Sequence, residues 1–317
     1  MLKRLFLVLL VLPFATAFAQ EFPNKPLRLI VPNPPGGSTD MVARRLAAGL
    51  AAELGQPVVV DNRGGASGTV GAQVAMSAPP DGYTLFFAPT SVMAINPAVM
   101  AKLPYDPLEH FAPVSLLSKQ PLLIAVTPSL PVNTLSELVA LAKSKPGQLN
   151  FAGTGASASL PLLNWAHLAG VQLTEIPYAG GGPGLAALIG GQVEIASLTL
   201  GTVYTHVHAK KIRGLGVTSS KRSPLAPEVP TVAELGFPGY EAMIWNGLAV
   251  PRGTPKDIIG RLNRATVKVM ASPEIMSQFA KDGIEIGTST PEKFEEYIRA
   301  EIIRWKKVAS DSGLKPQ

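Results

Sequence analysis

The stretch Leu27-Arg-Leu-Ile-Val-Pro-Asn-Pro-Pro-Gly-Gly-Ser-Thr-Asp-Met-Val-Ala-Arg-Arg-Leu46 predicts how this chain folds. It begins as an apolar strand, turns at two glycines and continues with the spacing of an amphipathic helix. Ser38 or Thr39 is expected to cap that helix, which ends before Gly55 and buries Val42, Leu46, Leu50 and Leu54. Free N–H groups at such a helix start favour a carboxylate or phosphate. A plain strand-turn-helix with no ligand is the alternative for this segment alone.

The first 19 residues predict export. Lys3 and Arg4 precede an apolar run that closes in Ala17-Phe18-Ala19, the small-x-small pattern of a signal peptide cleavage site. The run is shorter than the roughly 20 apolar residues of a membrane-spanning helix, and no second such run follows. We therefore expect an exported mature chain, cleaved after about Ala19.

The composition limits the class of protein. The chain has 317 residues and no cysteine, which excludes disulfides, a thiol nucleophile and cysteine metal sites. Its length predicts one large domain or, more readily, two of ordinary size. Removing Lys3 and Arg4 lowers the net charge from +6 to +4, without a basic block, so no nucleic-acid partner is expected.

Strands alternate with helices through most of the chain, which predicts an α/β fold with parallel sheets covered by helices on both faces. The clearest internal helix opens with the capping box Thr134-Leu-Ser-Glu137. After about Val250 only helices follow, with capping hydroxyls at Thr254-Pro255, Ser272-Pro273 and Thr290-Pro291. The expected strands are 27–31, 57–60, 84–88, 114–117, 122–127, 149–152, 174–178, 193–198, 213–218 and 244–250.

Two further glycine loops join a strand to a helix, at residues 151–161 and 178–184. With the first loop they would bring hydroxyls and amides together at the carboxyl ends of parallel strands, where open α/β sheets bind ligands. None of the three contains Lys or Arg, and none matches a nucleotide-binding fingerprint.

Catalytic patterns are sparse. The sequence contains neither G-x-S-x-G nor H-E-x-x-H. His206 and His208 fall in an expected helix, where positions two apart do not face each other, so no metal site is predicted. Asp40 fits either a general base or an acidic residue that complements a helix dipole. An exported hydrolase or transferase using Asp40 and a loop serine is the alternative to a binding protein.

The mature chain also carries a series of motifs along its whole length: Lys25-Pro-Leu-Arg-Leu-Ile-Val-Pro32, Pro34-Pro-Gly-Gly-Ser-Thr-Asp40, Leu54-Gly-Gln-Pro-Val-Val-Val-Asp-Asn-Arg63, Asp81-Gly-Tyr-Thr84, Ala94-Ile-Asn96, Leu103-Pro-Tyr-Asp106, Phe111-Ala-Pro-Val114, Lys145-Pro-Gly147, Pro177-Tyr178, Gly190-Gly-Gln-Val193, Pro230-Thr-Val-Ala-Glu234 and Ala249-Val-Pro-Arg-Gly-Thr-Pro255. This series resembles the Bug proteins, the periplasmic solute receptors of tripartite tricarboxylate transporters. The resemblance implies a type II periplasmic binding protein fold, with two α/β domains of parallel-rich mixed sheets and a cleft that closes on ligand.

The resemblance also implies partners and boundaries. The expected ligand is a small organic acid, the expected partners are the transporter's membrane components, and a sensor kinase is an alternative partner. We expect a periplasmic monomer with no cofactor.

The resemblance also implies the domain boundaries. Residues 20–120 and 246–317 should form domain 1, and residues 121–245 domain 2, with crossings after Pro121 and around 244–250.

The site residues are carried over from the family one loop at a time. The expected ligand-binding residues are Asn33, Pro35, Gly36, Gly37, Ser38, Thr39, Asp40, Thr90, Ser91, Thr154, Gly155, Ser157, Ser159, Tyr178, Gly180, Gly181 and Thr199. The family holds its ligand carboxylate largely through main-chain amides, hydroxyls and water.

Four places depart from the family pattern, and all are expected around the cleft. They are Asn33 in place of an aromatic residue, Ala179 in place of lysine, Pro161 in place of histidine, and Leu198-Thr199-Leu200 in place of an acidic-Asn pair. Trp165 and Trp245 are expected in the core, with an apolar wall of the cleft as the alternative.

Overall fold

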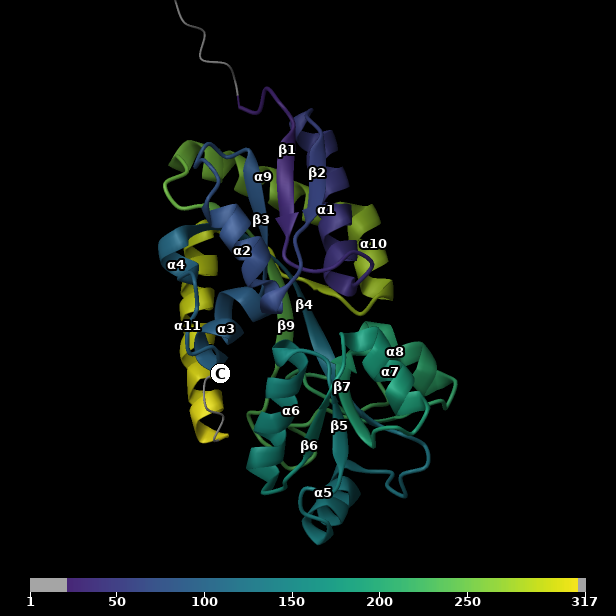
Figure 1. Ribbon diagram of the computed structural model, residues 1–317. Helices are drawn as coiled ribbons and strands as arrows, with labels where there is room; N and C mark the ends of the chain where they lie inside the picture. Colours follow the sequence, from purple (N-terminus) through teal and green to yellow (C-terminus); the bar gives the residue numbers. More distant parts are fainter. Residues whose placement is uncertain (1–21, 313–317) are drawn as a thin grey trace, which may run out of the picture.

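A computed structural model describes residues 22–312 (Figure 1), so the predicted signal peptide lies outside the described residues. The strands are β1 Leu27–Val31, β2 Val58–Asn62, β3 Thr84–Pro89, β4 Phe111–Val126, β5 Asn150–Gly153, β6 Thr174–Pro177, β7 Ile195–Thr199, β8 Arg213–Val217, β9 Met243–Pro251 and β10 Glu285–Ile286. The helices are α1 Ser38–Leu54, α2 Thr69–Met76, α3 Asn96–Val99, α4 Pro107–His110, α5 Leu135–Ser144, α6 Ala156–Ala169, α7 Gly181–Ile189, α8 Leu200–His208, α9 Lys256–Met270, α10 Pro273–Lys281 and α11 Pro291–Asp311, with short turns η1 Ala66–Gly68 and η2 Ser91–Ile95.

The strands lie in the order β2-β1-β3-β9-β4-β7-β5-β6, and β8 and β10 also pair with β4. Helices cover each half, and the two halves lie one above the other in Figure 1. Pairing is parallel among β1, β2 and β3 and among β5, β6 and β7, as predicted, but every pair that involves β4 or β9 is antiparallel. The sheets are therefore mixed, because the two crossing strands run against their neighbours.

The strands predicted at 114–117 and 122–127 are one strand, β4. Its residues up to Pro121 pair with β9, and its residues from Leu122 pair with β7. Pro121 stands where β4 changes partners, a place where a missing backbone N–H costs little. One continuous strand thus joins the two halves.

Helix α1 buries the predicted face, including Val42 and Leu46, and ends at Gly55 with φ 69°. Its N-cap is Gly37, not Ser38 or Thr39, and no side chain caps it. Gly37 is extended, with φ −83°, whereas Gly36 has φ +89° and takes the left-handed turn. The chain enters this helix through a glycine, which leaves its first N–H groups open.

Most of the other predicted caps form. Thr134, Ser272 and Thr290 each accept a hydrogen bond from a backbone N–H in the first turn of their helix. The prediction for Thr254 is wrong, because its hydroxyl donates to the carbonyl of Pro251. In the described part of the chain, no helix is long and apolar enough to cross a membrane.

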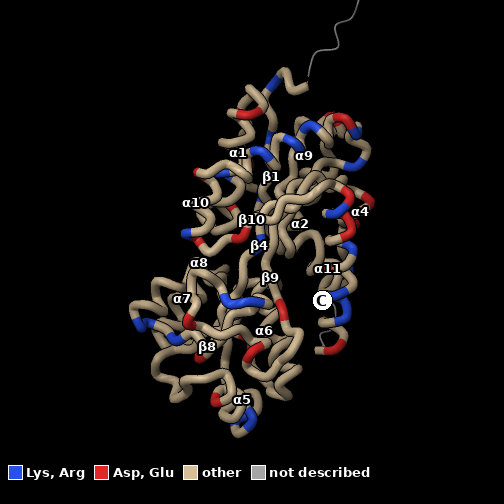
Figure 2. The backbone as a smooth tube through the Cα atoms, turned by 180° about the vertical axis from the view of Figure 1, so that it is seen from behind, with Lys and Arg blue, Asp and Glu red and all other residues tan. Residues whose placement is uncertain are grey.

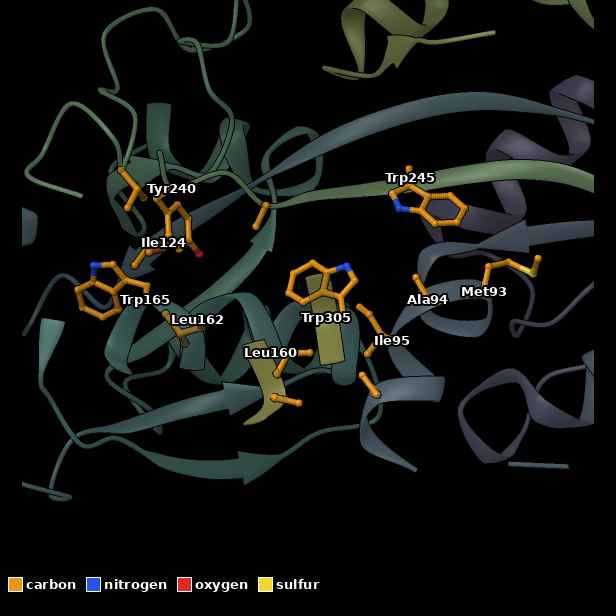
Figure 3. Close-up of a cluster of buried hydrophobic side chains, with 14 of the residues drawn as sticks. Met93, Ala94, Ile95, Ile124, Leu160, Leu162, Trp165, Tyr240, Trp245 and Trp305 are labelled. Atoms are coloured by element: carbon orange, nitrogen blue, oxygen red, sulfur yellow. The ribbon is translucent and has the colours of Figure 1, made fainter. Parts of the chain in front are cut away.

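One apolar core spans both halves. Trp165 and Trp245 are fully buried, as the core interpretation predicted. Figure 3 shows Trp305 of α11 between Leu160 of α6 and Ile95 of η2, so α11 from the end of the chain seals the joint between the halves.

Glu301, also in α11, is buried beside these tryptophans. Its Oε2 accepts hydrogen bonds from the indoles of both Trp245 and Trp305, at 2.9 and 3.1 Å. The carboxylate therefore ties α11 to the crossing strand β9.

Candidate functional site

A cavity of about 690 Å³ lies between the two halves. Its lining comes from the loop after β1, the end of β3, the starts of α6, α7 and α8, the crossing strands and the turn after α10. Thirteen of the predicted site residues line it: Asn33, Pro35, Gly36, Gly37, Ser38, Thr39, Thr90, Ser91, Thr154, Ser157, Gly180, Gly181 and Thr199. Loops far apart in the sequence thus meet around one space.

Within residues 22–312, four helices begin at this cavity: α1, α6, α7 and α8. None of the four has a side-chain cap. Of the helices that begin elsewhere, α4, α5, α10 and α11 are capped by Asp106, Thr134, Ser272 and Thr290, whereas α2, α3 and α9 have no side-chain cap. The uncapped starts present N–H groups and positive dipole ends to the cavity from both halves.

The first wall, residues 33–41, is held by side chains. Asp40 Oδ2 accepts hydrogen bonds from the Gly36 N–H and from Arg44 Nε, both at 2.9 Å. Asp40 Oδ1 accepts one from Asn62 Nδ2, which also donates to the carbonyl of Asn33. Burial alone would raise the pKa of Asp40, but hydrogen bonds from Arg44, Gly36 and Asn62 outweigh it and lower that pKa.

Asp40 therefore does not line the cavity as predicted. Its side chain is almost fully buried and points into the loop, where every oxygen lies on a donor. In this arrangement the carboxylate fixes the loop whose residues 33–39 and 41 line the cavity.

The second wall, residues 154–157 and 179–183, is built from backbone. Gly155 and Gly180 precede α6 and α7 with φ +114° and +103°, and a Cβ on either would meet no atom within 4 Å. Both positions need glycine for their backbone conformation, and Gly180 also lines the cavity.

Three predicted residues of the second wall do not line the cavity. Gly155 only turns the chain into α6, and Ser159 lies one turn inside that helix and donates to Glu175 Oε1 at 2.6 Å. The backbone N–H of Tyr178 donates to the Gly153 carbonyl, which continues the pairing of β5 and β6. These residues shape the wall from behind.

Thr90 lines the cavity, but its hydroxyl is already engaged. It donates to the carbonyl of Trp245 at 2.7 Å and accepts from the backbone N–H of Trp245 at 2.6 Å. Thr90 thus adds a side-chain contact to the pairing of β3 with β9, next to the place where β9 crosses between the two halves. Ser91, the neighbouring predicted residue, also lines the cavity.

The sequence analysis missed several lining residues. Met41, Leu122 and Ile244 add apolar surface, and Gln120 of β4 adds an amide. Asp282 and Ile284 come from the turn after α10, and Asp282 pairs with Arg45 at 2.5 Å. Alternation in the strands could have flagged Gln120, but no sequence signal places Asp282 here. Among the described residues, no Lys or Arg lines the cavity.

Most of the departures from the family pattern face the cavity. Asn33, Ala179, Leu198 and Thr199 line it, and Asn33 Oδ1 is buried without a hydrogen-bond partner. Pro161 and Leu200 were also expected around the cleft, but they do not line the cavity. Pro161 is buried inside α6, where its carbonyl accepts from the Tyr240 hydroxyl, and Leu200 is in the core.

Asp282 is the one charged residue among the described residues that line the cavity. Figure 2 shows basic and acidic residues interspersed along the outer helices α9, α10 and α11. His206 and His208 both lie on α8, and the described residues contain no cluster of three potential metal ligands.

Comparisons with known proteins agree with this geometry. The family profile described as "Tripartite tricarboxylate transporter family receptor" matches residues 42–314. Protein BugT of Bordetella pertussis is 38% identical over 304 residues, which cover 95% of this chain and 93% of BugT.

Solved structures are similar over nearly the whole chain. The structure titled "R. palustris Rpa4515 with adipate" has a TM-score of 0.88 at 35% identity and covers 94% of this chain and 100% of that one. MatC from Rhodopseudomonas palustris with bound malate has a TM-score of 0.83 at 32% identity and covers 90% of this chain and 99% of MatC. The chain therefore belongs to the Bug-type receptors of the tripartite tricarboxylate transporter family, and it is a solute receptor and not an enzyme.

Proposed function

We propose that this protein is an exported receptor that captures a small dicarboxylate in the cavity between its halves and delivers it to the membrane components of a tripartite transporter. The observation that carries the proposal is the meeting of four uncapped helix starts around a cavity whose described lining contains no Lys or Arg. An anion there would be held by backbone N–H groups, hydroxyls and helix dipoles.

The lining favours an acid with two charged ends and an apolar middle. Helix starts face the cavity from both walls, so each wall can hold one carboxylate. The lining also includes Met41, Leu122 and Ile244, whose apolar side chains suit methylene groups. Two related proteins were solved with adipate and malate, which have these features to different degrees.

The predicted domains, 20–120 with 246–317 and 121–245, would then close on the ligand as a monomer. β4 and β9 are the two crossings, and Thr90 fixes β9 at Trp245 on one side. An acid that contacts both walls favours the closed arrangement by its difference in affinity for the two states. Export with cleavage after about Ala19 would place this receptor in the periplasm.

The test is calorimetry of the mature chain, stripped of ligand, against adipate, malate, the monocarboxylate hexanoate, and a neutral sugar. We expect the tightest binding for a dicarboxylate, at micromolar Kd or below, with the acid recovered unchanged. Binding of the sugar alone, or equal binding of hexanoate and adipate, would contradict the proposal.

A further inference from the structure

One end of the cavity is closed by a backbone contact between the two halves. Gly201, in the first turn of α8, packs against the turn after α10. A Cβ on Gly201 would lie 1.9 Å from the carbonyl oxygen of Asp282, far inside contact distance. Both residues also line the cavity, so their contact lies at its edge.

The neighbouring residues make the contact equally tight. A Cβ on Gly283 would lie 2.7 Å from Leu225 Cδ2 and 3.8 Å from the Cα of Gly201. Because an α hydrogen of Gly201 occupies the direction that a Cβ would take, this hydrogen points at the Asp282 oxygen, as in Cα–H···O contacts between packed backbones. The backbones of Gly201 and Asp282 therefore meet directly, with the Leu225 side chain beside them against Gly283.

Local conformation does not explain glycine at position 201. Gly283 has φ +63° and needs glycine for its turn, but Gly201 lies within a helix and has no positive φ. Glycine weakens a helix relative to alanine, so α8 by itself would be more stable with alanine there. The contact with Asp282 is what requires the absence of a side chain.

The opposing turn is held in place. Arg45 of α1 pairs with Asp282 at 2.5 Å, and its guanidinium lies 5.6 Å from the ring centroid of Phe279. The Asp282 N–H also bonds back into the last turn of α10. A side chain added at Gly201 would therefore push α8 away from this turn more readily than it would displace the turn.

We infer that Gly201 is a closure residue: its lack of a side chain lets the two halves meet at this edge of the cavity, and a Cβ there holds the cavity open. The inference rests on the proposed function for its effect on ligand binding. Gly201 acts by setting the distance between the walls, so it is a positioning residue that needs no ligand contact of its own.

The test uses Gly201→Ala with Gly260→Ala as the matched control. Gly260 also lies within a helix, α9, and a Cβ there meets only the flexible end of Arg264, at 3.4 Å. Spin labels on Lys211→Cys, just after α8, and Met276→Cys in α10 report the distance between the halves, and the absence of native cysteine keeps the labelling specific. Both label positions are exposed.

We expect Gly201→Ala to shift the label distances to longer values, with and without adipate, and to raise the apparent Kd for adipate at least about tenfold, because fewer molecules can close. Gly260→Ala should match the parent in both measurements. Thermal unfolding of the unliganded variants should show that both fold.

Unchanged label distances in Gly201→Ala would overturn the inference, whatever the proteins bind. If the parent and Gly260→Ala bind neither adipate nor malate, the proposed ligand class fails instead, and the distances still decide the role of Gly201.

Discussion

The first wall of the cavity is tied by side chains, whereas the second is built from glycine backbone. Asp40 joins Gly36, Arg44 and Asn62 behind the first wall. The second wall enters α6 and α7 through Gly155 and Gly180, with no side-chain cap. The start of α1 is uncapped as well, so both walls present open helix N–H groups, but the first wall is fixed by side chains behind it and the second by the conformation of its glycines. The two walls therefore differ in what holds them in place.

The strongest test of this comparison is Gly180→Val. Its φ of +103° disfavours a β-branched residue, and the side chain would project where Gly180 lines the cavity. Losing one hydrogen bond to a charged ligand costs about 1.5–3 kcal/mol, and displacement of the ligand adds to that. We expect binding to fall by about 100-fold or more in calorimetry.

Gly147→Val is the control. Gly147 has φ +70°, meets no atom within 4 Å of a built Cβ, and lies away from the cavity. Both variants should lose about 1–3 kcal/mol of stability from backbone strain, but only Gly180→Val should lose binding. If Gly180→Val and Gly147→Val bind the ligand equally well, the second wall is not part of the binding site.

Asp40→Asn breaks the ties of the first wall. It leaves Arg44 without its ion pair. It also replaces a carboxylate oxygen, which accepts hydrogen bonds, with an amide nitrogen, which donates them, next to the donors of Gly36 and Asn62. We expect a loss of about 1–3 kcal/mol in the free energy of unfolding and about tenfold weaker ligand binding, because the loop loses its fixed position. Asp311→Asn, which breaks an exposed ion pair with Lys307, should change stability by less than about 0.5 kcal/mol.

Acid titration tests how much the charge of the Asp40 carboxylate contributes to stability. The pKa of Asp40 lies below its ordinary value of 3.8, so this carboxylate contributes stability above that pH and loses it as the pH falls through the lowered pKa. The difference in unfolding free energy between the parent and Asp40→Asn should therefore be constant near neutral pH and shrink at strongly acid pH. A constant difference down to the lowest pH at which both remain folded would contradict the role of the charge.

Thr154→Val tests a single hydroxyl of the second wall. Valine keeps the methyl group that packs over Gly184 and removes only the hydroxyl. We expect the Kd to rise about fivefold, equivalent to about 1 kcal/mol, with unchanged stability. Thr205→Val on the exposed face of α8 should leave the Kd unchanged. If Thr154→Val and Thr205→Val raise the Kd equally, the effect does not come from the loss of a hydroxyl in the cavity.

The smallest expected effect is that of salt. Since no Lys or Arg lines the cavity in the described chain, the Kd should change less than about twofold between low and moderate ionic strength. Met41→Lys places a cation on the first wall and should tighten binding at low salt and make it salt-dependent. A steep salt dependence in the parent protein would show that a basic side chain already contacts the ligand.

Local patterns predicted much of the fold. The apolar run of β1, the stripe of α1 and the hydroxyls before α5, α10 and α11 depend on neighbours in sequence, and the structure has them. The single strand β4 was predicted as two, because Pro121 normally interrupts a strand. Only its change of partner, from β9 to β7, makes that proline acceptable.

The cavity was less predictable than the fold. Glycine loops pointed to both walls, but a loop pattern does not show which atoms are already used. Asp40 and Thr90 are engaged by Asn62 and Trp245, partners set by tertiary packing. Asp282 joins the cavity through the turn after α10, more than 200 residues after the first wall.

The uncapped helix starts also matter when no ligand is bound. The positive dipole end of α1 then lies on one wall of the cavity and those of α6, α7 and α8 on the other, and bringing the walls together without an anion brings like partial charges closer in a poorly solvated space. On the proposed function, we expect this repulsion to disfavour closing of the empty receptor and an anion to remove it. A membrane partner that recognises the closed shape would then distinguish a loaded receptor from an empty one without contacting the solute.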